Sequence, residues 1–163
     1  MGRLKLKEEN NDTKTLGYSN ELWNKYTDDN TESLVNSPAK FIHHICLGLG
    51  VKKICELGCN LGNNLVDFSS EFDITGVDLN QNAINKAKKK FSSFDFKVAK
   101  IQETSFLDSQ FDLVYTRGVL IHVPEKDLND ALKEIFRISK KWIFNLEYFG
   151  EDGKMIPWKR GED

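Results

Sequence analysis

The fold of this protein can be inferred from one stretch, Lys53-Ile54-Cys55-Glu56-Leu57-Gly58-Cys59-Asn60-Leu61-Gly62-Asn63-Asn64. It opens with an apolar run, residues 54–57, which has the length of a short buried strand in a parallel sheet. The chain then turns through Gly58 and Gly62 into a segment with helical spacing, which we predict to be a helix over 62–70. A strand, a glycine-containing turn and a helix together present backbone N–H groups to a polar ligand.

A second strand is predicted at residues 73–77, and Asp78 follows it directly. In nucleotide-binding α/β folds, an acid about 20 residues after the glycine turn accepts hydrogen bonds from the ribose hydroxyls. The spacing from Gly58 to Asp78 agrees with this rule. The two features together predict a domain that holds an adenosine-type cofactor. A role for Asp78 as a helix cap or turn residue is the alternative.

Strand and helix patterns alternate along the rest of the chain. Further strands are predicted at 94–98, 111–115 and 142–147, and helices at 38–49, 80–91 and 124–138. Such alternation is typical of a parallel sheet with right-handed crossovers. We therefore expect an α/β, Rossmann-like fold with about five mainly parallel strands and helices on both faces.

The N-terminal region differs from this pattern. Residues 1–16 are charged and rich in asparagine, so we expect a mobile tail before a single domain over 17–163. Within that domain, 17–36 is a candidate lid helix with one aromatic face, formed by Tyr18, Leu22, Trp23 and Tyr26. These aromatic residues either pack on the domain as an ordinary amphipathic helix or close over a ligand, and the pattern does not separate the two.

Composition narrows the class of protein. The 163 residues suit one domain, and 23 Lys and Arg against 25 Asp and Glu leave a net charge of −2, so nucleic acid is not an expected partner. No apolar run has the length of a membrane span or a signal peptide, so we expect a cytoplasmic protein without membrane contact. Cys46, Cys55 and Cys59 are an odd number in apolar surroundings, which predicts reduced, buried thiols. No metal site is expected.

The glycine turn also discriminates between cofactors. A dinucleotide fingerprint, G-x-G-x-x-G, would need glycines where Asn60 and Asn63 stand. The motif present is E-x-G-x-N-x-G, from Glu56 to Gly62. With Asp78 at the end of the second strand, it resembles the class I methyltransferases that use S-adenosylmethionine. The resemblance implies that cofactor, with S-adenosylhomocysteine as the product.

Other segments resemble a narrower group, the pseudaminic-acid-biosynthesis-associated methyltransferase family. They are LWNKY at 22–26, ELGCNLGNNL at 56–65, FDLVYTRGVLIH at 111–122, and EY at 147–148. This resemblance implies methyl transfer to a small molecule, a sugar or nucleotide-sugar intermediate of surface glycan synthesis. Members of that family continue beyond the point that corresponds to Asp163, so we expect the sheet to lack the usual last two strands. Strand 142–147 would then be an apolar edge, which predicts a homodimer or a partner that covers it.

The residues that the resemblance places around the cofactor are Trp23, Tyr26, Glu56, Gly58, Asn60, Gly62, Asp78, Leu79, Ile101, Gln102, Thr116 and Arg117. Leu79 and Ile101 would enclose the adenine, with Gln102 at its edge, although both apolar side chains suit a core equally well. Glu56 would either brace the glycine turn or meet the amino group of the ligand.

Three residues are candidates for the chemistry. Transfer to an oxygen nucleophile requires removal of its proton, and His122 is the best-placed base, since imidazole is neutral near pH 7. Glu147 and Tyr148, after the fifth strand, would orient the acceptor. A histidine that merely ties its loop is the alternative for His122.

Three functions remain to be compared. The first is methyl transfer to a small molecule. The second is a non-catalytic module that binds S-adenosylmethionine or its product and needs a partner chain to complete an acceptor site. The third, a nicotinamide-dependent oxidoreductase, is disfavoured by the two missing glycines.

Overall fold

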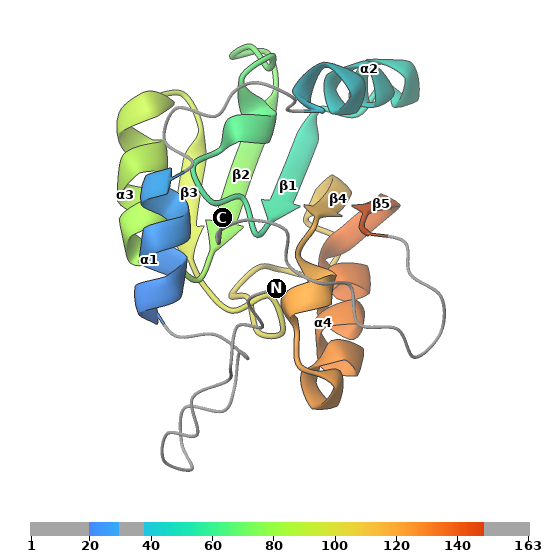
Figure 1. The fold of residues 1–163 in the computed structure, drawn as a ribbon. Coiled ribbons are helices and arrows are strands. Elements are labelled where there is room, and N and C mark those ends of the chain that lie inside the picture. The colour runs from blue at the N-terminus through green and yellow to red at the C-terminus, as the bar shows by residue number, and fades with distance from the viewer. Residues whose placement is uncertain (1–19, 30–37, 149–163) are drawn as a thin grey trace.

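The computed structural model describes residues 20–29 and 38–148 (Figure 1). The predicted tail at 1–16, residues 17–19 and 30–37 of the predicted lid, and residues 149–163 lie outside the described residues. Two short 3₁₀ helices, η1 (Asn63–Leu65) and η2 (Leu120–His122), accompany four helices and five strands. The helices are α1 (Asn20–Asp29), α2 (Ala39–Leu49), α3 (Gln81–Lys90) and α4 (Glu125–Ile138), and the strands are β1 (Lys53–Leu57), β2 (Asp73–Asp78), β3 (Asp95–Val98), β4 (Phe111–Arg117) and β5 (Ser139–Leu146).

The five strands form one parallel sheet in the order β3-β2-β1-β4-β5. This confirms the predicted α/β, Rossmann-like architecture. The chain winds outward in one direction from β1 to β3 and in the other from β4 to β5. The carboxyl ends of β1 and β4 therefore flank a topological switch point, where open α/β sheets bind their ligands.

Helices cover both faces of the sheet. Side chains of α2 and α3, such as Ile42 and Ile84, pack with Ile54, Ile74 and Tyr115 on one face. On the other face, the α4 residues Ala131, Ile135 and Ile138 pack with Leu57, Val77 and Val114. The alternation along each strand explains this division, because successive side chains of a strand point to opposite faces. Helix α1 lies beside α3 (Figure 1).

The predicted state of the cysteines is confirmed, since Cys46, Cys55 and Cys59 are all buried free thiols. They lie in the two apolar clusters on either face of the sheet. None of the helices in the described ranges has the length and apolar character that crossing a membrane would require.

The predicted helix over 62–70 is wrong. The chain forms only the 3₁₀ helix η1 there, with hydrogen bonds from Leu65 N to Gly62 O (2.9 Å) and from Phe68 N to Leu65 O (3.1 Å). Asparagine, aspartate and serine compete with a helical backbone for hydrogen bonds, and 63–70 contains five of them. Asn64 in particular turns inward to Glu56, so it helps to build the site rather than a helix.

Candidate active site

The turn after β1 is tied to the end of β2. The backbone N–H groups of Gly58 and Cys59 both donate to Val77 O, at 2.7 and 2.9 Å. Gly58 has φ +78°, and a Cβ atom there would overlap the side chain of Val119. The protein's own packing therefore requires this glycine, in addition to the predicted close passage of a ligand. At Gly62, with φ +71°, a Cβ would lie 3.0 Å from the Phe91 ring.

Asp78 joins that turn to the start of α3. Its Oδ2 accepts a hydrogen bond from Asn60 N (2.8 Å), and its Oδ1 accepts one from Asn80 N (2.8 Å). Burial raises the pKa of Asp78, and these backbone N–H groups act in the opposite direction. The helix cap is Asn80, whose side chain accepts from Asn82 N and Ala83 N. Asp78 therefore has the turn role that was its alternative, and its free lone pairs leave the predicted ribose contact open to it.

Glu56 is fully buried beneath the turn, 0% exposed, beside Tyr115 of β4. Asn64 Nδ2 donates to its Oε1 (2.6 Å), and Arg117 Nη1 donates to Asn64 Oδ1 (3.3 Å). Burial raises the pKa of Glu56 to about 8, against the effect of the Asn64 hydrogen bond. The Tyr115 hydroxyl also acts on this carboxylate and lowers its pKa, but Glu56 Oε2 has no hydrogen bond of ordinary geometry within the described residues. Glu56 thus braces the turn through η1, while its contact with a ligand stays a prediction.

The ends of β4 and β5 support the loop that carries His122. The buried Thr116 hydroxyl lies 2.8 Å from Glu147 Oε1 and 2.9 Å from Asn145 Oδ1. The Glu147 carboxylate also accepts from Val119 N and Leu120 N, each at 3.2 Å. Glu147 therefore fixes the backbone that leads into η2. Its predicted contact with an acceptor is untested.

His122 lies in η2, next to α1. Its ring centroid is 5.1 Å from that of Trp23, with the two planes at 85°, and Trp23 in turn meets Tyr26 at 5.8 Å. Burial lowers the pKa of His122 to about 4, so the imidazole is neutral at pH 7 and is a weaker base than a solvated histidine. Tyr148 is 66% exposed and lies against Gly118.

The three residues predicted to contact the adenine, Leu79, Ile101 and Gln102, differ in their surroundings. Ile101 is buried in the α4-side core with Leu57 and Val77, as its alternative interpretation allowed, whereas Leu79 stays partly exposed. Gln102 Oε1 is buried without a hydrogen-bond partner among the described residues. Gln102 lines an open hollow of about 380 Å³ whose other walls are Glu103, Asp130, Lys133, Glu134 and Arg137.

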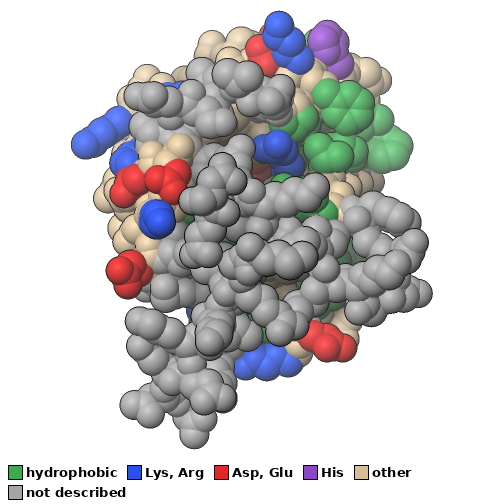
Figure 2. All heavy atoms as spheres, viewed as in Figure 1, with side chains coloured by type: hydrophobic (Ala, Val, Ile, Leu, Met, Phe, Trp, Pro, Cys, Tyr) green, Lys and Arg blue, Asp and Glu red, His purple; other side chains and the backbone are tan. Residues whose placement is uncertain are grey.

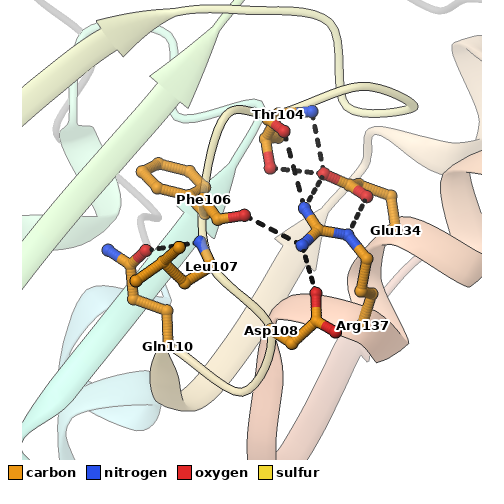
Figure 3. Close-up of polar contacts among 7 residues, drawn as sticks. All are labelled: Thr104, Phe106, Leu107, Asp108, Gln110, Glu134 and Arg137. Carbon is orange, nitrogen blue, oxygen red and sulfur yellow. Dashed lines mark hydrogen bonds and ion pairs between the residues drawn. The ribbon is translucent and has the colours of Figure 1, made fainter.

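A polar network holds the loop after Gln102 against α4 (Figure 3). Arg137 donates to Glu134 Oε2 (2.7 Å), to Asp108 Oδ1 (2.6 Å) and to Phe106 O (2.8 Å). Glu134 also accepts from Thr104 N (2.8 Å). Hydrogen bonding from Arg137 lowers the pKa of Glu134 to about 2. Sequence reasoning missed this network, although a Glu and an Arg three positions apart on a helix are a recognisable pair.

Sequence reasoning also missed Thr27 of α1, which is 0% exposed. Its hydroxyl lies 3.3 Å from Asn60 Oδ1 and accepts a hydrogen bond from Asn80 Nδ2 at 3.3 Å. Beside it, Asp28 pairs with Lys86 of α3 at 2.6 Å. The signal was present in the sequence, since Thr27 stands four residues after Trp23 on the same helix face.

The turn at 58–62, Asp78 and the loop that carries His122 therefore all lie at the carboxyl edge of the sheet. Helix α1 contacts both the turn and His122. Over residues 20–29 and 38–148, no three His, Cys, Asp or Glu side chains come together as a metal site.

Residues 54–141, more than half of the chain, match a family described as a methyltransferase domain. The chain belongs to this methyltransferase domain family. Among solved structures, it is similar to a SAM-dependent methyltransferase from Methanosarcina mazei, with 31% identity and a TM-score of 0.54 over 61% of this chain and 52% of that one. The family and this neighbour support S-adenosylmethionine as the cofactor of the domain.

Two curated relatives show how widely this domain is shared. Phosphoethanolamine N-methyltransferase 1 of Arabidopsis thaliana is 28% identical over 56% of this chain and 19% of its own length. The ubiquinone/menaquinone biosynthesis C-methyltransferase of Rickettsia bellii is 32% identical over 52% of this chain and 36% of its own. The methyltransferase domain thus spans well under two thirds of the curated relatives it matches.

Proposed function

We propose that this chain transfers a methyl group from S-adenosylmethionine to a small-molecule acceptor. The observation that carries the proposal is the placement of the cofactor turn, with Asp78, and of His122 at one edge of the sheet. S-adenosylmethionine supplies an activated methyl group, since its sulfonium leaves as the neutral thioether of S-adenosylhomocysteine. Orienting two reactants can account for about 7–11 kcal/mol of the barrier, so such a site needs positioning above all.

Each part of the site then has a task. The turn at 58–62 and the Asp78 carboxylate bind and orient the cofactor. His122 accepts the proton that the acceptor oxygen loses as its bond to the methyl carbon forms, because a neutral imidazole carries a basic ring nitrogen. Glu147 holds the loop in place, and Trp23 keeps bulk water from His122.

For the acceptor, we propose a sugar or nucleotide-sugar intermediate of surface glycan synthesis. The support is the resemblance carried by residues 111–122 and 147–148. The two curated relatives are named for a phosphoethanolamine and a quinone pathway, so the shared cofactor domain does not by itself select an acceptor.

The test has two stages. Thermal shift with S-adenosylmethionine, S-adenosylhomocysteine and NAD should show stabilisation by the first two only. Sugar and nucleotide-sugar acceptors are then screened for the formation of S-adenosylhomocysteine, with His122→Gln as the inactive control that still binds cofactor. Binding without turnover on any acceptor would favour the non-catalytic module, and stabilisation by NAD alone would reject the proposal.

We also propose that a second copy of the chain covers β5, an outer strand of the described sheet. The backbone groups on its free side are unpaired within the sheet, and another strand is the structure that satisfies them. Large apolar side chains are exposed on and beside it: Trp142 and Ile143 of β5, Leu132 and Phe136 of α4, and Phe41 of α2. Figure 2 shows hydrophobic side chains gathered on the side of the molecule where α2 and β5 lie.

The charges on β5 favour an antiparallel pair of copies. Parallel pairing would place Lys140 and Lys141 beside the same lysines of the partner, whereas antiparallel pairing about Ile143 places Lys141 opposite Asn145. Light scattering should therefore show a dimer that Ile143→Lys converts to a monomer. Leu107→Lys, at an equally apolar exposed position on a loop, should stay dimeric. A wild-type monomer at every concentration would contradict this proposal.

A further inference from the structure

Helix α1 connects two halves of the site. The cofactor half is the turn at 58–62 with Asp78 and Asn80, and the acceptor half is the loop with His122. Trp23 and Thr27 are one helical turn apart and lie on the same helix face. Thr27 reaches the cofactor half, where its hydroxyl contacts the side chains of Asn60 and Asn80. Trp23 reaches the acceptor half, where its ring meets His122.

The contacts of Thr27 fall at the part of the cofactor half that Asp78 organises. Asn60 and Asn80 are the residues whose backbone N–H groups donate to the two Asp78 carboxylate oxygens. Asn60 has φ +46°, so its side chain is presented by a backbone conformation that the turn itself imposes. The position of α1 is therefore coupled to the geometry of the turn that holds the cofactor.

A helix of this size depends on such anchors. At 10 residues, α1 is shorter than the roughly 12–15 residues at which an isolated helix becomes even marginally stable in water. The Asp28–Lys86 pair is exposed on the Asp28 side, and exposed ion pairs contribute little. The buried Thr27 hydroxyl is a stronger anchor, because its loss would remove a hydrogen-bond partner from the part-buried side-chain amides of Asn60 and Asn80.

We propose that Thr27 is a positioning residue that docks α1 on the turn at 58–62 and so holds Trp23 against the His122 ring, which limits the contact of that ring with water. The proposal rests on the proposed function, because it assigns His122 the role of base. It also explains why α1 contacts both halves of the site. Because α1 docks on the turn at 58–62, Trp23 can cover His122 only when that turn is formed.

Burial is the cause of the lowered pKa of His122, so uncovering the ring should return it toward its ordinary value. The ionisable side chains of α1 are Glu21, Lys25, Tyr26, Asp28 and Asp29, and the neighbouring elements add Arg117 at the end of β4, Glu125, Lys126 and Asp127 at the start of α4, and Glu147 after β5. The variants below leave all of these unchanged. A shift in the His122 titration would therefore report a change in its exposure to water.

The experiment is a proton NMR titration of the three histidines in the full chain, with His122 assigned by the His122→Gln variant. In wild type, His122 should titrate near pH 4. In Thr27→Val, which keeps the shape and removes the hydroxyl, it should move up toward 6.5. His43 and His44 serve as internal references and should not move. Trp23→Ala should give the same shift, and Thr27→Ser should restore the wild-type value.

Thr104→Val is the matched control. Thr104, like Thr27, is a buried threonine with a hydrogen-bonded hydroxyl, but its partner is Glu134 of α4. The variant should leave the His122 titration unchanged even if it lowers stability. An unshifted His122 in folded Thr27→Val, or the same shift in Thr104→Val, would overturn the proposal. The titration requires no turnover, so it can fail or succeed independently of methyl transfer.

Discussion

At the scale of single residues, the carboxylates that we predict to meet a ligand also hold the local fold together. Asp78 spans the turn and α3 through two backbone N–H groups. Glu147 does the same for Val119 and Leu120. Hydrogen bonds to charged groups contribute about 1.5–3 kcal/mol each. Residues that the motif assigns to ligand binding therefore also stabilise the local fold.

Asp78→Asn should weaken S-adenosylmethionine binding at least tenfold in calorimetry, because a tenfold change is about 1.4 kcal/mol and one charged acceptor is lost. The control is Asp112→Asn at the other end of the sheet. Asp112 Oδ2 accepts from Lys52 N (3.2 Å) and Lys53 N (2.9 Å) in a comparable way. Its variant should lose stability and keep its affinity. Equal affinity losses in the two variants would argue against a ribose contact.

At the scale of elements, the turn after β1 is shaped by its packing partners as well as by its sequence. Gly58 is required because the Val119 side chain occupies the space of a Cβ. Val119 itself is held in place by Glu147. The glycine turn, which we predict to bind the cofactor, and the loop that carries His122 are thus in direct contact.

Gly58→Ala should therefore destabilise the protein by more than about 2 kcal/mol, since a left-handed alanine costs roughly 1–2 kcal/mol before the clash with Val119 is counted. The comparison is Gly48→Ala in α2, where nothing lies within 4 Å of the added Cβ. That change should stabilise by about 0.5–1 kcal/mol, as alanine replaces glycine in a helix. Urea unfolding measures both. A neutral Gly58→Ala would show that the loop yields without strain.

At the scale of the whole molecule, two buried acids have opposite effects on the pH dependence of stability. Glu134 has a lowered pKa. Its contribution to the free energy of unfolding is therefore present above pH 4.5, the ordinary pKa of a glutamate, and is lost as the pH falls toward 2. Glu56 has a pKa raised from 4.5 to about 8, so the folded state retains a proton that the unfolded state releases. Its contribution is present below pH 4.5 and lost as the pH rises to about 8.

The cofactor-free protein should accordingly lose stability between pH 5 and 8, and Glu56→Gln should flatten that decline because an amide does not ionise. Urea unfolding at a series of pH values tests this. Only the difference between the two curves is informative, because other groups, including Asp78, titrate in both proteins. Parallel curves would mean that Glu56 does not carry the effect.

Much of the fold followed from local chemistry that is visible in the chain. The run Ile54–Leu57, the paired glycines and Asp78 predict the strand, the turn and the acid that ends β2. The periodicity of 124–138 predicts α4. These inferences hold because strand and helix periods, caps and turn residues act over a few neighbouring positions. The helix predicted at 62–70 failed because Asn64 makes a tertiary contact with Glu56 that outweighs weak helical preference.

The sequence by itself therefore determined the parallel α/β class, the glycine turn after β1 and the presence of α1. Tertiary structure decided what these elements contact: Thr27 against Asn60 and Asn80, Trp23 against His122, and Glu147 beneath the loop. The physical reason is the distance along the chain. Thr27 and Asn60 are 33 positions apart, and Glu147 and Val119 are 28 apart. No local pattern reports such a pair, because only the winding of the sheet brings its two members together.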